Sequence, residues 1–240
     1  MKVIIARDYS EQCSAAADII EDIVRAKPDC CLGLATGSSP VGMYKELARR
    51  CAEEGLDFSR VHSVNLDEYI GLAPEHDQSY RYFMNSNLFD HINIDKANTY
   101  VAGGVGDVDA GIAEFNAVIE RSDIDVQVLG VGPDGHLGFN EPGEAFELET
   151  HCVDLTAETI EANKRFFDGN EALVPKQAYT MGIKTIMQAR KVLMVANGKG
   201  KAEIIKKAFF GPVTPEVPAS ILQMHPDFTL VGDEEALSLI

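Results

Sequence analysis

Segments with the period of a β-strand alternate along this chain with segments that have the period of an α-helix. Short apolar runs, the first of them β-branched, occur at 3–5, 31–35, 61–66, 126–131, 192–196 and 228–231. Between several of these runs, apolar residues recur every three or four positions, at 13–24, 43–51, 108–119 and 202–209. Because such alternation favours a mostly parallel sheet with helices on both faces, we predict an α/β fold.

The length of 240 residues fits one large domain, and the chain shows no internal repeat, low-complexity tract or long linker. We therefore predict a single domain over residues 1–240. The least regular stretch, about 156–178, mixes charged and apolar residues. Both a small helical lid and a plain surface excursion are compatible with it.

The charge of the chain excludes some partners. Lys and Arg number 21 and Asp and Glu number 38, a net charge of −17. This argues against nucleic acid or an anionic membrane as a partner, although a local site can still bind a small anion. No apolar run approaches the ~20 residues of a membrane span, and the N-terminus does not resemble a signal peptide. Five cysteines without a zinc-site spacing indicate a reduced, cytoplasmic protein.

Ligands of an open parallel sheet bind beyond the carboxyl ends of its strands, so the residues that follow each strand matter most. The first such end is LATGSSP at 34–40, which leads from a strand into a helix. Free N–H groups and hydroxyls in such a turn can bind an anion. The segment lacks the dinucleotide and P-loop patterns, so we expect a sugar phosphate there. An ordinary capped helix start, with Ser39 as N-cap and Pro40 as first helical residue, is the alternative.

The second strand end, NLDEYIGL at 65–72, places two carboxylates directly after an apolar strand. Adjacent side chains there point in different directions, so Asp67 and Glu68 need not share a role. One of them could face the cleft as a base. A charged turn is the alternative.

The third strand end, GVGPDGHLGFNEP at 130–142, is the most informative. Four glycines surround Asp134 and His136, and Glu141 follows just beyond them. An imidazole in a glycine-rich turn with two acids nearby is suited to proton transfer at neutral pH. The three side chains could also bind a metal, but spacing alone does not establish ligands from different elements, and we predict no metal. No nucleophile elbow or Cys–His pair supports acyl transfer.

Two downstream cations are candidates for neutralising a phosphate. Arg165 lies in ANKRFF, and Lys201 follows a strand and a small turn. Arginine offers a bidentate fork to phosphate. A solvated surface charge is the alternative for each.

These motifs, together with VPKQAYTMGI, occur in an order that closely resembles the glucosamine-6-phosphate deaminase family, from about Leu32 to Asp233. The resemblance implies a Rossmann-like fold. It also implies conversion of glucosamine 6-phosphate to fructose 6-phosphate and ammonia, a step of amino-sugar catabolism, without metal or organic cofactor.

The resemblance also implies a role for each site residue. Asp67 matches the family's enolisation base, and Asp134, His136 and Glu141 match its ring-opening group. The family's contacts with the sugar phosphate match Thr36, Gly37, Ser38, Ser39, Arg165 and Lys201.

Two rival functions remain to be weighed. A 6-phosphogluconolactonase of the same fold would share the PDGH segment, but the GFNEP continuation and the DEY motif favour the deaminase. A non-catalytic sugar-phosphate sensor would be expected to lack Asp67 or His136, and both are present.

One segment departs from the family's allosteric hexamers, which carry a Ser and two cations after the Asn-Glu-Pro segment. Glu144, His151 and Val153 fall at those places, and the hexamers' C-terminal extension is not matched. We therefore expect no effector activation, and a monomer or small homo-oligomer.

Overall fold

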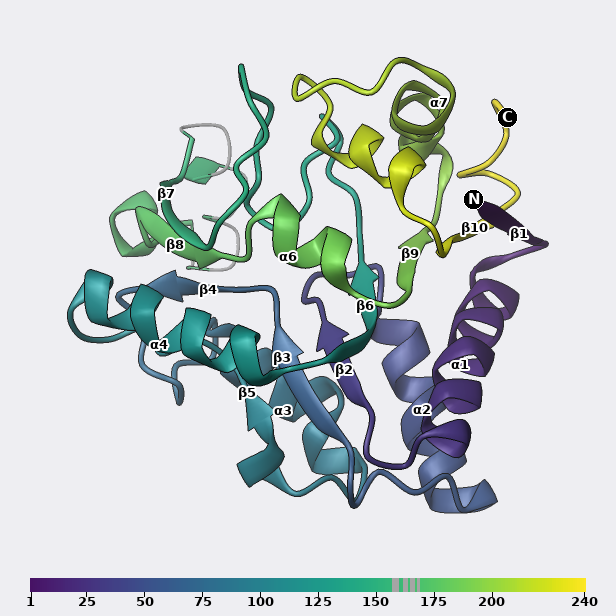
Figure 1. The fold of residues 1–240 in the computed structure, drawn as a ribbon, viewed down its shortest axis with the longest axis horizontal. Coiled ribbons are helices and arrows are strands. Elements are labelled where there is room, and N and C mark those ends of the chain that lie inside the picture. Colours follow the sequence, from purple (N-terminus) through teal and green to yellow (C-terminus); the bar gives the residue numbers. More distant parts are fainter. Residues whose placement is uncertain (157–159, 162–163, 165–166, 168) are drawn as a thin grey trace.

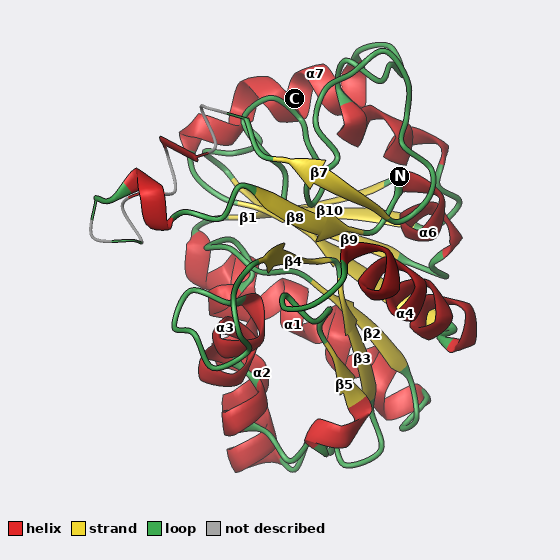
Figure 2. Ribbon diagram, turned by 90° about the vertical axis from the view of Figure 1, so that its left-hand side faces the viewer, coloured by secondary structure: helices red, strands yellow, loops and turns green. Residues whose placement is uncertain are grey.

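The computed structural model describes residues 1–156, 160–161, 164, 167 and 169–240. Ten strands within this part of the chain form two sheets (Figures 1 and 2). The larger sheet contains β1 (Lys2–Ala6), β2 (Cys31–Leu34), β3 (His62–Asn65), β5 (Thr99–Tyr100), β6 (Ile124–Leu129), β9 (Val192–Ala196) and β10 (Phe228–Asp233). Its order is β1-β10-β9-β6-β2-β3-β5, and every neighbouring pair is parallel. The smaller sheet is antiparallel, in the order β4 (Asp67–Ile70), β8 (Gln177–Thr180) and β7 (His151–Asp154).

Helices cover both faces of the larger sheet, as the alternating pattern predicts. One side carries α1 (Tyr9–Ala26), α2 (Val41–Glu54) and α3 (Tyr80–Asn87). The other carries α4 (Val108–Arg121), α6 (Ile183–Gln188) and α7 (Ala202–Phe210). Short 3₁₀ turns are η1 (Phe89–His91), η2 (Lys96–Asn98), η4 (Glu171–Leu173), η5 (Lys199–Lys201) and η6 (Pro218–Met224). In the described residues, no helix has the length and apolar character that crossing a membrane requires.

Strand β9 shows why the central strands read as continuous apolar runs. Leu193 and Val195 join the core cluster that includes α1 and α2, whereas Val192, Met194 and Ala196 join the cluster that includes α4, α6 and α7. Successive side chains of a strand point to opposite faces, and both faces of this sheet are covered. A polar side chain on either face would therefore be buried, so both faces of the central strands are mostly apolar.

The side of the sheet on which the chain adds new strands changes between β2 and β6. From β2 the chain adds β3 and β5 on one side, and from β6 it adds β9 and β10 on the other. At such a switch point the loops that follow the two strands diverge and leave a crevice. The segments after β2 and β6 are the first and third of the strand ends that the sequence singles out.

The smaller sheet was not predicted. The sequence suggested one strand over 61–66, but β3 ends at Asn65 and the chain enters β4 at Asp67. Leu66 joins the sheets, because its N–H donates to Leu34 O (3.0 Å) and its carbonyl accepts from Met181 N (2.8 Å). Asp67 therefore lies in a paired strand rather than in a turn.

Eight residues of the stretch 156–178, for which the sequence left a helical lid and a surface excursion open, lie outside the described residues. The part that is described includes η4, and its last two residues belong to β8. Gln177 pairs with Ile70 of β4 and with Asp154 of β7, so this end of the segment is built into the smaller sheet.

Candidate active site

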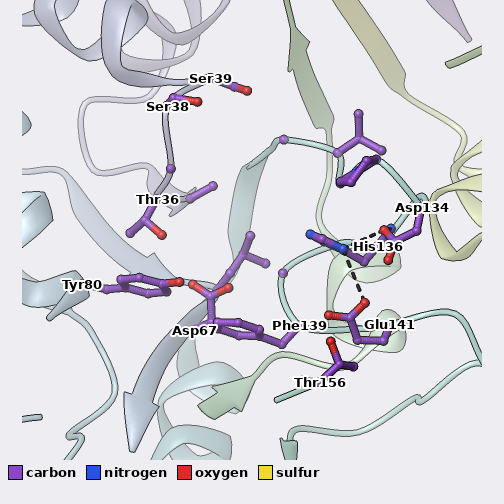
Figure 3. A pocket seen from close by; sticks show the side chains of 18 of the residues that line it. Thr36, Ser38, Ser39, Asp67, Tyr80, Asp134, His136, Phe139, Glu141 and Thr156 are labelled. Carbon is purple, nitrogen blue, oxygen red and sulfur yellow. Dashed lines mark hydrogen bonds and ion pairs between the residues drawn. The ribbon is translucent and has the colours of Figure 1, made fainter. Parts of the chain in front are cut away.

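A pocket of about 800 Å³ opens at the switch point of the larger sheet. Nine of the ten residues that the sequence predicted for the site line it: Thr36, Gly37, Ser38, Ser39, Asp67, Asp134, His136, Glu141 and Lys201 (Figure 3). The tenth, Arg165, lies outside the described residues. Three strand ends and the start of α7 thus meet at one cavity.

The loop between β2 and α2 forms one wall of the pocket. Gly37 has a φ of +88°, which a residue with a side chain rarely adopts. Within the described residues, the N–H groups of Gly37, Ser38 and Ser39 make no hydrogen bond, so they are available to an anion. The predicted cap differs by one position: Pro40 occupies the N-cap of α2, and Ser39 lies before it without a capping bond.

Asp67 lies at the bottom of the pocket, where the first strand of the smaller sheet begins. Its side chain is buried, and among the described residues Oδ1 has no hydrogen-bond partner. Burial raises the pKa of Asp67 to about 8; the charge of Glu68 adds to the rise, and His136 opposes it. A carboxylate in this state is a stronger base than an exposed one.

The loop after β6 brings the two acids to His136. Nδ1 of His136 lies 2.7 Å from Asp134 Oδ1 and 3.5 Å from Glu141 Oε2 (Figure 3). A Cβ at Gly132 would lie within 2.4 Å of the imidazole ring, so only glycine lets the loop fold back under the histidine. Gly132 therefore serves the placement of the His136 side chain.

The electrostatics of this group favour the charged imidazole. Burial lowers the pKa of His136, but the hydrogen bonds and charges of Asp134 and Glu141 outweigh burial and raise it to about 9. The hydrogen bond from His136 in turn holds the pKa of Asp134 well below its usual range. Since both carboxylates contact Nδ1, the other ring nitrogen faces the pocket (Figure 3).

The same three side chains are also the group that could offer ligands to a metal, with ligand atoms within 4.8 Å of one another. A metal at Nδ1 would have to displace the proton that the two carboxylates hold there. The raised pKa of His136 makes that displacement costly at neutral pH.

Lys201 reaches the pocket from the junction of η5 and α7. Its Nζ donates to Val131 O over 2.6 Å, which ties the start of α7 to the loop after β6. Burial lowers the pKa of Lys201, and the charge of Asp134 opposes this shift. The ammonium is thus a partly desolvated cation that lines the pocket beside the loop after β6.

An aromatic wall near Asp67 was not predicted. The ring centroids of Tyr69 and Tyr80 are 4.8 Å apart, and the Phe139 ring lies 5.7 Å from Tyr69 and 6.2 Å from Tyr80. Ser79 caps α3 by accepting from Tyr82 N, so Tyr80 is the first residue of that helix. This capping pattern was the available signal, but it does not show which way the helix faces.

Comparison with known proteins identifies the family. The model of the glucosamine-6-phosphate isomerases/6-phosphogluconolactonase family matches residues 8–230. The chain belongs to this family. The resemblance predicted from the motifs is confirmed at this level.

Relatives within the family are similar over their whole length. A protein of Clostridium perfringens named glucosamine-6-phosphate deaminase is 51% identical over 242 residues, which cover all of both chains. Another with this name, from Lachnoclostridium phytofermentans, is 56% identical over 234 residues, 96% of this chain and 98% of that one.

Solved structures agree with the fold. One described as a monomeric glucosamine-6-phosphate deaminase superposes with a TM-score of 0.95 at 40% identity, over all of both chains. A 6-phosphogluconolactonase from Leishmania guyanensis reaches a TM-score of 0.76 at 19% identity, covering 98% of this chain and 97% of its own, and shows the fold alone. The predicted α/β, Rossmann-like fold is confirmed.

Proposed function

We propose that this chain is a glucosamine-6-phosphate deaminase, which converts glucosamine 6-phosphate and water to fructose 6-phosphate and ammonia. The observation that carries the proposal is the meeting, in one pocket, of a buried base, an acid–histidine group and a loop with free N–H groups. Full-length relatives at about half identity bear this name.

Substrate binding follows from the two walls that could hold an anion. The N–H groups and hydroxyls of residues 36–39 would bind the phosphate, and Lys201 would neutralise part of its charge. A fixed phosphate would hold the sugar so that the base meets C2 rather than another carbon. Arg165 is proposed as a further phosphate contact on the resemblance alone.

Ring opening is assigned to His136. In its neutral form, the nitrogen that faces the pocket accepts the proton of the anomeric hydroxyl, and the imidazolium then returns a proton to the ring oxygen. Asp134 and Glu141 stabilise the imidazolium between these steps. Because the pKa of His136 is about 9, the neutral fraction increases as the pH rises from 7 to 9.

Isomerisation and deamination are assigned to Asp67. Its carboxylate takes the proton from C2 of the open aldehyde and returns it to C1, while one proton of the amine passes to O1, which leaves an imine at C2 and a hydroxyl at C1. Water adds to the imine, and the C–N bond breaks to give the ketose and ammonia. A pKa of about 8 matches the base to neutral or slightly alkaline pH.

A lactonase would use this site differently. Hydrolysis of a lactone breaks an ester bond and removes no proton from carbon, so it requires no base like Asp67. The lactonase structures are also under 25% identical to this chain. The buried carboxylate therefore supports the deaminase.

The deciding experiment follows both products with a chelator present. We expect the purified protein to form ammonia and fructose 6-phosphate from glucosamine 6-phosphate in equal amounts. Asp67→Asn should reduce the rate by at least about 10²-fold. Activity only on 6-phosphogluconolactone would refute the assignment, and loss of activity with the chelator would refute the metal-free chemistry.

We also infer a cytoplasmic, monomeric enzyme. All five cysteines are free thiols, and three of them are buried, as suits a reducing compartment. The solved relative with a TM-score of 0.95 is described as monomeric. Glu144, His151 and Val153 stand where the resemblance to allosteric hexamers would require other residues.

A further inference from the structure

Glu68 is a second buried carboxylate beside the proposed base. It is 1% exposed, although it lies next to Asp67 on β4. Successive side chains of a strand point to opposite faces, so Glu68 points away from the pocket that Asp67 faces. Buried acids are uncommon unless they are paired, so its partners indicate its use.

The partners of Glu68 are three main-chain N–H groups. Its Oε1 accepts from Tyr69 N (2.8 Å) and Tyr80 N (2.9 Å), and its Oε2 accepts from Arg81 N (3.0 Å). Two of these donors belong to the first turn of α3, where N–H groups lack partners within the helix. The carboxylate thus joins β4 to the start of a helix twelve residues further along the chain.

This junction sets the position of Tyr80. Its side chain leaves the first turn of α3 and points toward the Asp67 carboxylate (Figure 3). Its ring also stacks on Phe139, with planes 3° apart. The Arg81 side chain holds the same turn from the other side, since it donates to Thr99 Oγ1 (2.7 Å) and Thr99 O (3.0 Å).

We propose that Glu68 is a positioning residue for the base Asp67. It fixes the aromatic wall over the base, and it places a second negative charge beside it that increases the affinity of Asp67 for a proton. This inference rests on the proposed function only where it concerns the effect of Glu68 on the reaction rate. The arrangement itself can be tested without substrate.

The charged groups near Asp67 and Glu68 shift the pKa values of these two carboxyl groups. Burial raises the pKa of Glu68 to about 7, but the three N–H donors and the charge of Arg81 limit the rise. Three N–H groups donate to Glu68 whereas Asp67 Oδ1 has no partner among the described residues, so Glu68 holds a negative charge more readily, and that charge opposes ionisation of Asp67. His136 acts the other way on Asp67.

Neutral groups complete the surroundings. The hydroxyls of Tyr80 and Tyr44 lie near enough to Asp67 that its charge raises the pKa of each phenol. Tyr69 contacts Tyr80 beside them. Neither the Tyr44 phenol nor the Tyr80 phenol is ionised in the range where the two carboxylates titrate.

The first test is a titration of the free protein by NMR with ¹³C-labelled side-chain carboxyl groups. The Asp67 resonance is assigned by its loss in Asp67→Asn. We expect Asp67 to titrate near pH 8 and to sense the ionisation of Glu68 as a second, lower step. Titration of Asp67 near the ordinary value of about 4 would overturn the proposal, whether or not the protein is a deaminase.

The second test compares Glu68→Gln with two matched variants. Glu68→Gln should lower the pKa of Asp67 by about 1 unit and move the acidic limb of the kcat/KM profile equally to lower pH. Ser79→Ala removes the cap of α3 without changing charge, so it should lower stability and leave the limb in place. Glu75→Gln removes an exposed charge from the same loop and should change neither.

The outcomes separate the two hypotheses. If the wild-type enzyme is active and the acidic limb of its kcat/KM profile does not move in either Glu68→Gln or Ser79→Ala, Glu68 only stabilises the helix. That result refutes the inference. A wild-type protein without deaminase activity refutes the proposed function, and the NMR titration then decides the inference by itself. The wild-type titration also decides it if Glu68→Gln does not fold.

Discussion

At the scale of single residues, Asp67 combines basicity with a cost in stability. Its folded pKa of about 8 lies above the ordinary value of about 4, so the folded state binds this proton more tightly than the unfolded state. The stability that this one proton contributes is therefore fully present below pH 4 and is lost as the pH rises through 8. A base that must be desolvated to act weakens the fold at the pH where it acts.

Replacing this carboxylate should therefore stabilise the protein while it abolishes turnover. We expect Asp67→Asn to raise the free energy of unfolding at pH 9 by at least about 1 kcal/mol more than at pH 5, where the Asp67 carboxyl is ionised in the unfolded state but still neutral in the folded one. Urea unfolding at the two pH values measures the difference. Asp22→Asn, an exposed change on α1, is the control and should show no such dependence. If Asp67→Asn changed the free energy of unfolding equally at both pH values, the pKa of Asp67 in the folded state would not be raised.

Lys201 separates binding from chemistry. Since its ammonium faces the pocket and donates to a main-chain carbonyl rather than to a proposed acid–base side chain, Lys201→Ala should raise KM by about tenfold and change kcat much less. Steady-state kinetics over a range of glucosamine 6-phosphate concentrations would show the split. Lys206→Ala, on the exposed side of α7, should leave both constants unchanged. A normal KM in Lys201→Ala would rule out this cation as a phosphate ligand.

At the scale of elements, the loop after β6 and strand β8 approach each other closely around the base. Gly138 has a φ of +60°, and a Cβ there would lie 2.8 Å from Thr180 Oγ1 and 3.3 Å from Asp67 Oδ2. Thr180 Oγ1 also accepts from Phe139 N over 3.1 Å. The contact between loop and strand thus leaves space for a hydrogen atom only.

Gly138→Ala should disturb both activity and stability. We expect kcat to fall by about tenfold or more and the free energy of unfolding to fall by about 2 kcal/mol, because the methyl group strains the backbone and displaces Thr180 or Asp67. Gly55→Ala is the matched control: Gly55 also has a positive φ, +68°, but no atom lies within 4 Å of its added Cβ. Gly55→Ala should lower the free energy of unfolding by about 1 kcal/mol and leave kcat unchanged. Equal kcat values for the two variants would mean that the loop accommodates the methyl group.

The element scale also shows where periodicity was and was not sufficient. The helices at 9–26, 41–54 and 108–121 contain the stripes that predicted them, because one face of each is buried. Strands β4, β7 and β8 have four residues each, and they alternate too briefly to give a clear period. Their pairing stabilises them, and pairing between residues 67–70 and 177–180 is not visible locally.

At the scale of the whole molecule, the proposed monomer is directly measurable. Light scattering coupled to size exclusion should give a mass near 26.1 kDa, the mass of one chain. The net charge of −17 favours separation of copies at low salt, so the measurement belongs at 0.15 M salt or above. A stable mass several times larger would contradict the proposal.

The sequence by itself determined the alternation of strands and helices that gives the larger sheet, the family and nine of the residues that line the pocket. Turns such as 130–142 are specified locally, because glycines set the backbone and the acids lie within a few residues of His136. The tertiary structure alone decided how strong Asp67 is as a base, which aromatic side chains surround it, and that Lys201 contacts a carbonyl 70 residues away. These properties depend on burial and on contacts between distant segments. Desolvation is set by everything packed around a group, so no local pattern encodes it.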